Sequence, residues 1–187
     1  MPAEWEPHEA TWISWPKNLE TFGEMLPRVE GIFIEMAIAL QSGERINILV
    51  DDEQSRERVA KMLEDAGADV SRNIIFHLIR TADVWVRDYG PIFVKRGDSR
   101  LMTKWIFNAW GGKYSDLAED TAVFDKIGPD LGFQIRKTGI VLEGGSIDVN
   151  GKGTLLTTEQ CLLAKTRNPH LSRSQIESKL MEYLGAR

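Results

Sequence analysis

The segment with the clearest chemical content covers residues 83–91 and reads Asp-Val-Trp-Val-Arg-Asp-Tyr-Gly-Pro. Asp88 has the two oxygens that a planar guanidinium group prefers to meet in a bidentate pair. Trp85, three residues earlier, could lie along an aliphatic stem and add a cation–π attraction of about 0.5–2 kcal/mol. Alternatively, Arg87 and Asp88 form structural ion pairs while Trp85 fills the core. The segment therefore predicts either a guanidinium site or a structural cluster.

A second segment, residues 141–148, places Glu143 directly before Gly144 and Gly145. Two glycines let the backbone approach a ligand closely or adopt a positive φ. Glu143 would then be a buried acceptor that faces a cation or orients a histidine. The alternative is a plain turn before a strand that begins at Ser146.

Aromatic residues and glycines fill a third segment, residues 107–114, with Trp110 at its centre. It could form a pocket wall or serve only as packing. Three of the six tryptophans, Trp5, Trp12 and Trp15, lie near the beginning of the sequence. Alternation over residues 10–15 favours a strand with core aromatics there.

The elements that must position the first segment alternate between helix and strand. Helical spacing predicts helices over residues 25–40 and 53–66, and apolar runs predict strands over 45–50 and 74–79. The continuous apolar run at 74–79 suggests burial on both faces. Residues 83–91 would follow that strand at its carboxyl end, where sites gather.

The second half reads as strand pairs with single helices. We expect hairpins over 92–94 with 101–106 and over 146–150 with 154–157, the latter turning at Asn-Gly. A helix should begin at Asp116 with Glu119 as its capping-box partner, and another after Ser172. A short helical segment covers 159–164. The order indicates an α/β chain of ββαβ units.

Composition limits the class of protein. The 187 residues carry a net charge of −5 with scattered basic residues, which gives no footprint for nucleic acid. A single cysteine, Cys161, and three separated histidines predict no metal site. With no signal peptide and no membrane-spanning apolar run, we expect a cytoplasmic protein without a metal or other cofactor.

Taken together, the segments resemble the agmatine deiminase and bacterial-type peptidylarginine deiminase family. Matching segments occur in the same order at residues 1–5, 7–12, 85–91, 107–114 and 142–148, the last leading into 151–163. The resemblance implies a five-bladed α/β propeller (pentein) built of ββαβ units. It implies further that residues 1–187 are the N-terminal portion of one deiminase domain, truncated after about half the blades.

In that family a cysteine attacks the guanidinium carbon, ammonia leaves, and water resolves the thiouronium intermediate. A histidine handles the protons. By resemblance, Asp88 binds the guanidinium, Glu143 is the acidic residue near substrate and histidine, and Trp85 is the wall beside the substrate stem. We also expect Arg87 and Trp110 to contribute to substrate binding.

The sequence departs from the family in its catalytic residues. The family's His-x-Asp motif and its cysteine after a glycine run are not found, and Cys161 matches a non-catalytic segment. Apolar neighbours predict that Cys161 is an inert small side chain. We therefore expect a truncated, split or separately expressed N-terminal portion that has no deiminase activity alone.

The expected function is agmatine hydrolysis to N-carbamoylputrescine and ammonia in the full-length enzyme, within putrescine biosynthesis. The expected partners are agmatine, the missing C-terminal half and a second copy of the chain, with no nucleic acid and no membrane. Alternatives are a non-catalytic guanidino-binding fragment, a peptidylarginine deiminase, or an unrelated α/β interaction protein.

Overall fold

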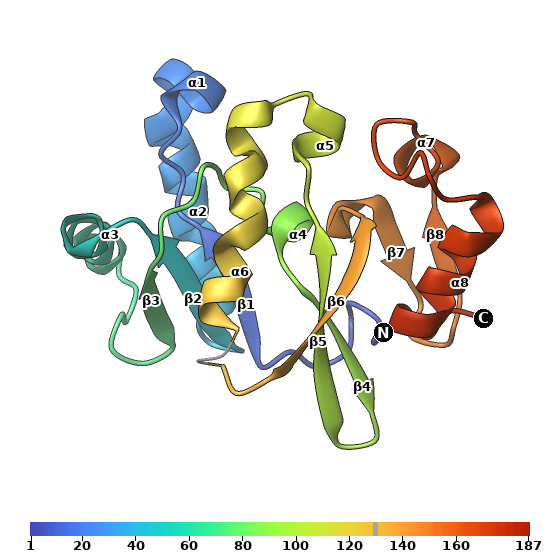
Figure 1. Ribbon diagram of the computed structural model, residues 1–187. Coiled ribbons are helices and arrows are strands. Elements are labelled where there is room, and N and C mark those ends of the chain that lie inside the picture. Colours follow the sequence, from blue (N-terminus) through green and yellow to red (C-terminus); the bar gives the residue numbers. More distant parts are fainter. Residues whose placement is uncertain (129–130) are drawn as a thin grey trace. The chain divides into compact units, whose positions relative to one another are not determined.

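The computed structural model describes residues 1–128 and 131–187, which form two compact units. One unit covers residues 7–86, and the other joins residues 1–6 to 87–187 (Figure 1). The first unit contains, in chain order, β1 (Ala10–Ser14), α1 (Leu19–Phe22), a 3-10 helix (Gly23–Met25), α2 (Leu26–Leu40), β2 (Arg45–Val50), α3 (Glu53–Asp65) and β3 (Ile74–Leu78).

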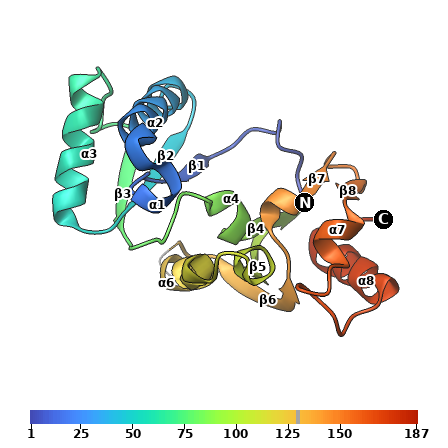
Figure 2. The same cartoon turned by 90° about the horizontal axis from the view of Figure 1, so that it is seen from above.

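A three-stranded parallel sheet in the order β1-β2-β3 organises the unit of residues 7–86. Apolar side chains from one face of this sheet form a core with α2 and α3, which lie next to each other (Figure 2). Ile48, Val59 and Leu63 are fully buried in that core. The predicted helices and strands are therefore confirmed here, with α3 capped by Asp52, whose carboxylate accepts from the Ser55 N–H at 2.8 Å.

The predicted burial of β3 on both faces is wrong. Ile74 and Phe76 pack into the core, but the alternate residue Ile75 is 42% exposed and Leu78 at the strand's end is 51% exposed. The reason is position: β3 is the edge strand of its sheet and packs against the helices on one face only.

Over its described residues, the other unit runs through four short helices, five strands, two 3-10 helices and a final longer helix. They are α4 (Val86–Tyr89, at the boundary between the units), β4 (Ile92–Arg96), β5 (Ser99–Ile106), α5 (Ala109–Gly112), a 3-10 helix (Ser115–Ala122), α6 (Val123–Ile127), β6 (Gln134–Val141), a 3-10 turn (Gly144–Ser146), β7 (Ile147–Val149), β8 (Leu155–Thr157), α7 (Glu159–Leu162) and α8 (Arg173–Leu184).

Both predicted hairpins are confirmed, as antiparallel pairs β4–β5 and β7–β8. β6, which no sequence pattern predicted, pairs parallel to β5 and completes a sheet in the order β4-β5-β6. Apolar residues of these strands pack against α7 and α8 in one core, which includes Trp105, Leu142 and Leu180. The predicted cap of α8 is present as a full capping box between Ser172 and Gln175.

The helix predicted to begin at Asp116 is wrong in its cap and, over residues 115–122, in its type, whereas its continuation over α6 (Val123–Ile127) is α-helical. Residues 115–122 form a 3-10 helix that begins after Tyr114, and its first residue receives no side-chain cap. Of the apolar residues predicted for one face of this helix, Leu117, Phe124 and Ile127 are nevertheless at most 7% exposed, and Leu131 is partly buried. Packing of these side chains therefore outweighs the local capping signal.

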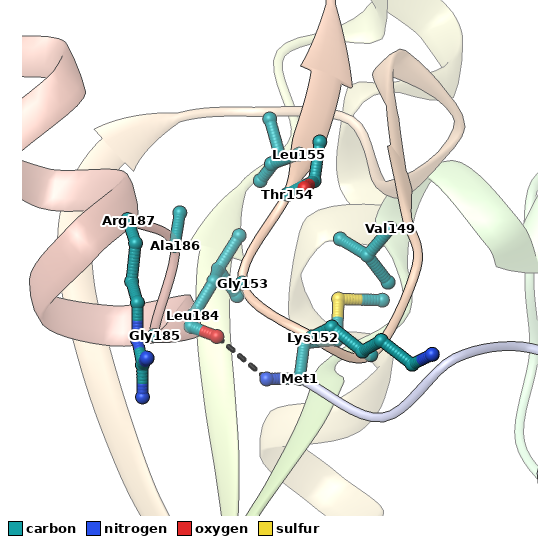
Figure 3. Close-up of a pocket in the computed structure, with 11 residues that line it drawn as sticks. Met1, Val149, Lys152, Gly153, Thr154, Leu155, Leu184, Gly185, Ala186 and Arg187 are labelled. Atoms are coloured by element: carbon teal, nitrogen blue, oxygen red, sulfur yellow. Dashed lines mark hydrogen bonds between the residues drawn. The ribbon is translucent and has the colours of Figure 1, made fainter.

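A small pocket lies beside the β7–β8 turn and the end of α8 (Figure 3). The amino group of Met1 donates to the Leu184 carbonyl at 2.6 Å there. The lining includes Lys152 and Arg187 but none of the five residues predicted for the functional site. Within the described ranges, no helix has the length and apolar character needed to cross a membrane.

Candidate functional site

Asp88 lies in the single turn of α4, which Tyr89 anchors to the core. Tyr89 is 1% exposed, and its ring lies 6.1 Å from that of Phe107 and 6.5 Å from that of Phe124. The adjacent Asp88 carboxylate accepts from two donors that are distant in sequence. Its Oδ1 accepts from the Gly145 N–H at 3.0 Å, and its Oδ2 from the Trp110 Nε1–H at 3.1 Å.

Partial burial changes the acidity of this carboxylate. Removal from water raises the pKa of Asp88, while the Gly145 and Trp110 donors and the nearby charge of Arg87 act in the opposite direction. Desolvation disfavours the charged form of a carboxylate, and a cation close to it favours that form again. Asp88 is therefore suited to hold a positively charged group.

Trp110 reaches Asp88 from an unusual left-handed turn. Ala109, Trp110, Gly111 and Gly112 have consecutive φ values of 53°, 56°, 82° and 78°. Such a conformation costs roughly 1–2 kcal/mol for a residue with a side chain. Asn108 helps to offset this cost, since its Oδ1 accepts from the Gly111 N–H at 2.8 Å. The turn thus directs the Trp110 indole N–H at Asp88, and a substrate contact by Trp110 stays a prediction.

Glu143 follows the end of β6 by two residues and is 3% exposed. Its backbone carbonyl accepts from both the N–H and the hydroxyl of Ser146, at 2.9 and 2.6 Å. Its Oε1 accepts from Nε of Arg167 at 2.8 Å. Over residues 1–128 and 131–187, Glu143 Oε2 is the one buried side-chain oxygen or nitrogen that has no hydrogen-bond partner.

The two glycines after Glu143 permit close contact between the two acidic segments. A Cβ atom on Gly144 would lie less than 3.0 Å from the Arg87 carbonyl oxygen, and one on Gly145 equally close to the Asp88 carboxylate. Neither glycine has a positive φ. The positive φ is therefore wrong for these glycines, and the close approach that the structure shows is to the segment that carries Asp88, while approach to a ligand stays a prediction.

Arg87 and Trp85 differ from Asp88 in their surroundings. The Arg87 side chain is 53% exposed and donates to the Glu4 carboxylate. Trp85 belongs to the unit of residues 7–86 and is 43% exposed, so the alternative in which it fills the core is wrong. Their predicted contacts with substrate stay predictions.

Sequence reasoning missed Arg167 and Asn168. Asn168 is 3% exposed, and its side-chain amide bonds both the N–H and the carbonyl of Val141 at 2.9 Å. The segment has no periodicity, and its Asn-Pro pair signals only a turn. An arginine with a largely covered side chain beside a buried glutamate could not be inferred from that pattern.

The residues expected to play no catalytic role also have defined places. Cys161 lies on α7, is partly exposed and forms no disulfide. Its inertness is still a prediction. In the described parts of the chain, no group of three or more His, Cys, Asp or Glu side chains could hold a metal ion.

Comparisons with known proteins bear on this geometry. Residues 1–187 match the family described as Porphyromonas-type peptidyl-arginine deiminase. The chain is 41% identical to the agmatine deiminase of Ectopseudomonas mendocina, over 98% of the chain and 50% of that protein. It is 40% identical to the agmatine deiminase of Stutzerimonas stutzeri, over 98% of the chain and 50% of that protein.

A solved structure agrees with the sequence relatives. Agmatine deiminase of Enterococcus faecalis, described as catalysing its reaction, superimposes with a TM-score of 0.89 at 35% identity. The match covers 100% of the chain and 51% of that structure. The chain therefore spans about half the length of the relatives that it matches.

Proposed function

Because the chain belongs to the Porphyromonas-type peptidyl-arginine deiminase family, we propose that it supplies the guanidinium-binding carboxylates of an agmatine deiminase. The whole enzyme converts agmatine and water to N-carbamoylputrescine and ammonia. Relatives from two organisms that are at least 40% identical bear the name agmatine deiminase, which supports this substrate.

In this proposal Asp88 and Glu143 accept hydrogen bonds from the guanidinium nitrogens. Each Asp88 oxygen has one protein donor, which leaves lone pairs for a ligand. Glu143 offers Oε2, which is buried and has no partner. Two such carboxylates stabilise a cationic substrate and the cationic intermediate that follows from it, because preorganised charge acts strongly in a water-poor site.

The observation that carries the proposal is the hydrogen bond from the Gly145 N–H to Asp88 Oδ1. It joins Asp88 to the Glu-Gly-Gly segment, and both belong to the unit of residues 1–6 and 87–187. A purely structural ion-pair role for Asp88 has less support, because its oxygens accept from the Trp110 indole and the Gly145 backbone, and neither donor is a cationic side chain.

The chemical step needs groups that we assign outside these 187 residues. The sequence has one cysteine, Cys161, and its three histidines include none in a His-x-Asp motif. We therefore propose that this chain binds and orients the guanidinium, while the attacking thiol and the proton-transferring histidine come from elsewhere in the enzyme.

Calorimetry on the purified chain tests the binding part. Agmatine should bind, whereas putrescine, which has no guanidine, should not. Asp88→Asn keeps the shape and an acceptor oxygen but removes the charge. We expect this variant to bind agmatine about ten- to a hundredfold more weakly, in line with about 1.5–3 kcal/mol for a hydrogen bond to a charged group. Asp98→Asn, in the exposed turn between β4 and β5, is the matched control and should leave the affinity unchanged.

Other outcomes separate the alternatives. Tighter binding of an N-acetyl-arginine amide than of agmatine would favour a peptidylarginine deiminase. Binding without ammonia release, when the remaining part of a homologous deiminase is supplied, would favour a non-catalytic binding fragment. Equal agmatine binding by wild type and Asp88→Asn would refute the assigned role of Asp88.

A further inference from the structure

The pair of Arg167 and Glu143 is the least exposed ion pair among the described residues. Arg167 Nε lies 2.8 Å from Glu143 Oε1, and the two side chains are 13% and 3% exposed. Burying a guanidinium and a carboxylate costs several kcal/mol per ion, roughly, before their attraction offsets it. A buried ion pair of this kind contributes little net stability, so its presence needs an explanation other than stability.

The segment that carries Arg167 is fixed on both sides. Asn168 bonds both backbone groups of Val141, the last residue of β6. The Thr166 carbonyl accepts from Asn108 Nδ2 at 2.9 Å, just before the left-handed turn that carries Trp110. The segment of Arg167 is therefore anchored to the strand that leads into Glu143 and to the loop whose Trp110 donates a hydrogen bond to Asp88.

The contact between the two side chains uses only one carboxylate oxygen. Arg167 Nε donates to Oε1, while its Nη1 donates to the hydroxyl of Thr166 at 3.2 Å. An arginine that maximised its own pairing would meet both oxygens in parallel. Here Oε2 stays without a donor although it is buried, a state that costs about 1–3 kcal/mol.

We propose that Arg167 is a positioning residue: it holds Glu143 by Oε1 so that Oε2 can accept a hydrogen bond from the substrate guanidinium. This inference rests on the proposed function. It adds Arg167 to the site and gives the two Glu143 oxygens different partners: Oε1 accepts from the guanidinium of Arg167, and Oε2 accepts from the guanidinium of the ligand.

Charge gives a second reason for Arg167. Asp88 and Glu143 contribute −2 and Arg167 contributes +1, which leaves −1 to match one guanidinium, while the charge of Arg87 is met by Glu4. Without Arg167, two unbalanced carboxylates would share the site, and like charges favour protonation of one of them. Arg167 thus keeps both acceptors usable at once.

The test combines agmatine calorimetry with a double-mutant cycle on the full chain. Arg167→Gln should lower the affinity for agmatine by about ten- to a hundredfold, the range usual for residues that orient a ligand-binding group. Arg167→Lys, which keeps the charge, should restore part of this loss. Arg173→Gln removes an exposed arginine that pairs with Glu159 and Glu177 on the surface, and should have no effect.

The cycle distinguishes positioning from general stability. If Arg167 acts through Glu143, the double variant Arg167→Gln/Glu143→Gln binds agmatine no more weakly than Glu143→Gln alone. Full additivity of the two losses, or wild-type affinity in Arg167→Gln, would overturn the inference. Failure of the wild type to bind agmatine would instead refute the proposed function and the inference with it.

A measurement on the wild type guards against variants that do not fold. The NMR signal of the Arg167 side-chain Nε–H should exchange slowly with water and shift as agmatine saturates the site. Rapid exchange, or no shift at saturation, would count against the proposed role.

Discussion

Substitution of Gly144 by alanine tests whether the two acidic segments must touch. A Cβ atom at this position would lie less than 3.0 Å from the Arg87 carbonyl oxygen, where ordinary contact begins at 3.4 Å. The neighbour is backbone, so it cannot rotate away, and the segments must separate. Overpacking of this kind typically costs about 1–3 kcal/mol.

The consequence for the site follows from one hydrogen bond. The Gly145 N–H lies 3.0 Å from Asp88 Oδ1, and a separation of only about 0.5 Å would bring it to the limit of a hydrogen bond. If the strain appears as lost affinity, about 1.4 kcal/mol per tenfold change predicts agmatine binding weaker by about ten- to a hundredfold. Calorimetry measures the affinity, and thermal melting confirms that the variant is folded.

Gly31→Ala is the matched control for this variant. Gly31 lies inside α2, and an added Cβ would meet nothing within 4 Å. Alanine is favoured over glycine in a helix interior by about 1 kcal/mol, so this change should raise the melting temperature and leave agmatine binding unchanged. If Gly144→Ala bound agmatine as tightly as Gly31→Ala does, the reasoning about converging segments would be refuted.

Four further predictions concern single side chains. Trp110→Phe keeps a ring but removes the Nε1–H donor to Asp88, and should weaken agmatine binding by about 1.5–3 kcal/mol, measured by calorimetry. Burial raises the pKa of Asp88, so its contribution to folding is full below the ordinary aspartate pKa and is lost as pH rises through the raised value. Urea denaturation at several pH values should therefore show Asp88→Asn gaining stability relative to wild type over that interval. Burial lowers the pKa of His77, so its contribution to folding stability is present above the ordinary histidine pKa and is lost as pH falls through the lowered value. The melting temperature of His77→Gln should therefore fall less steeply than that of wild type as the pH is lowered. Met102→Ala, at a fully buried position, should lower the free energy of unfolding by about 2–5 kcal/mol in urea, without changing the secondary structure seen by circular dichroism.

The fold class was predictable to a large extent. The expected α/β chain of the pentein propeller type agrees with the TM-score of 0.89 to an agmatine deiminase, of which the chain covers about half. Short elements with strong local patterns were also correct, including β2 (Arg45–Val50) and the Ser172 cap of α8. Strand β6 was missed because its sequence, Gln134–Val141, mixes polar residues with Gly139 and gains its stability from pairing with β5.

Local sequence determined where most of the strands and helices form, with β6 and the 3-10 helix at Ser115–Ala122 as exceptions, and it marked Asp88 and Glu143 as the acidic residues of interest. This succeeds because periodicity, capping and turn residues act over a few neighbouring positions. Tertiary structure alone decided that Trp110 donates to Asp88 and that Arg167 occupies one oxygen of Glu143 while the other stays open. Those contacts join residues more than twenty positions apart, and their existence depends on how the chain turns back on itself and which groups it removes from water.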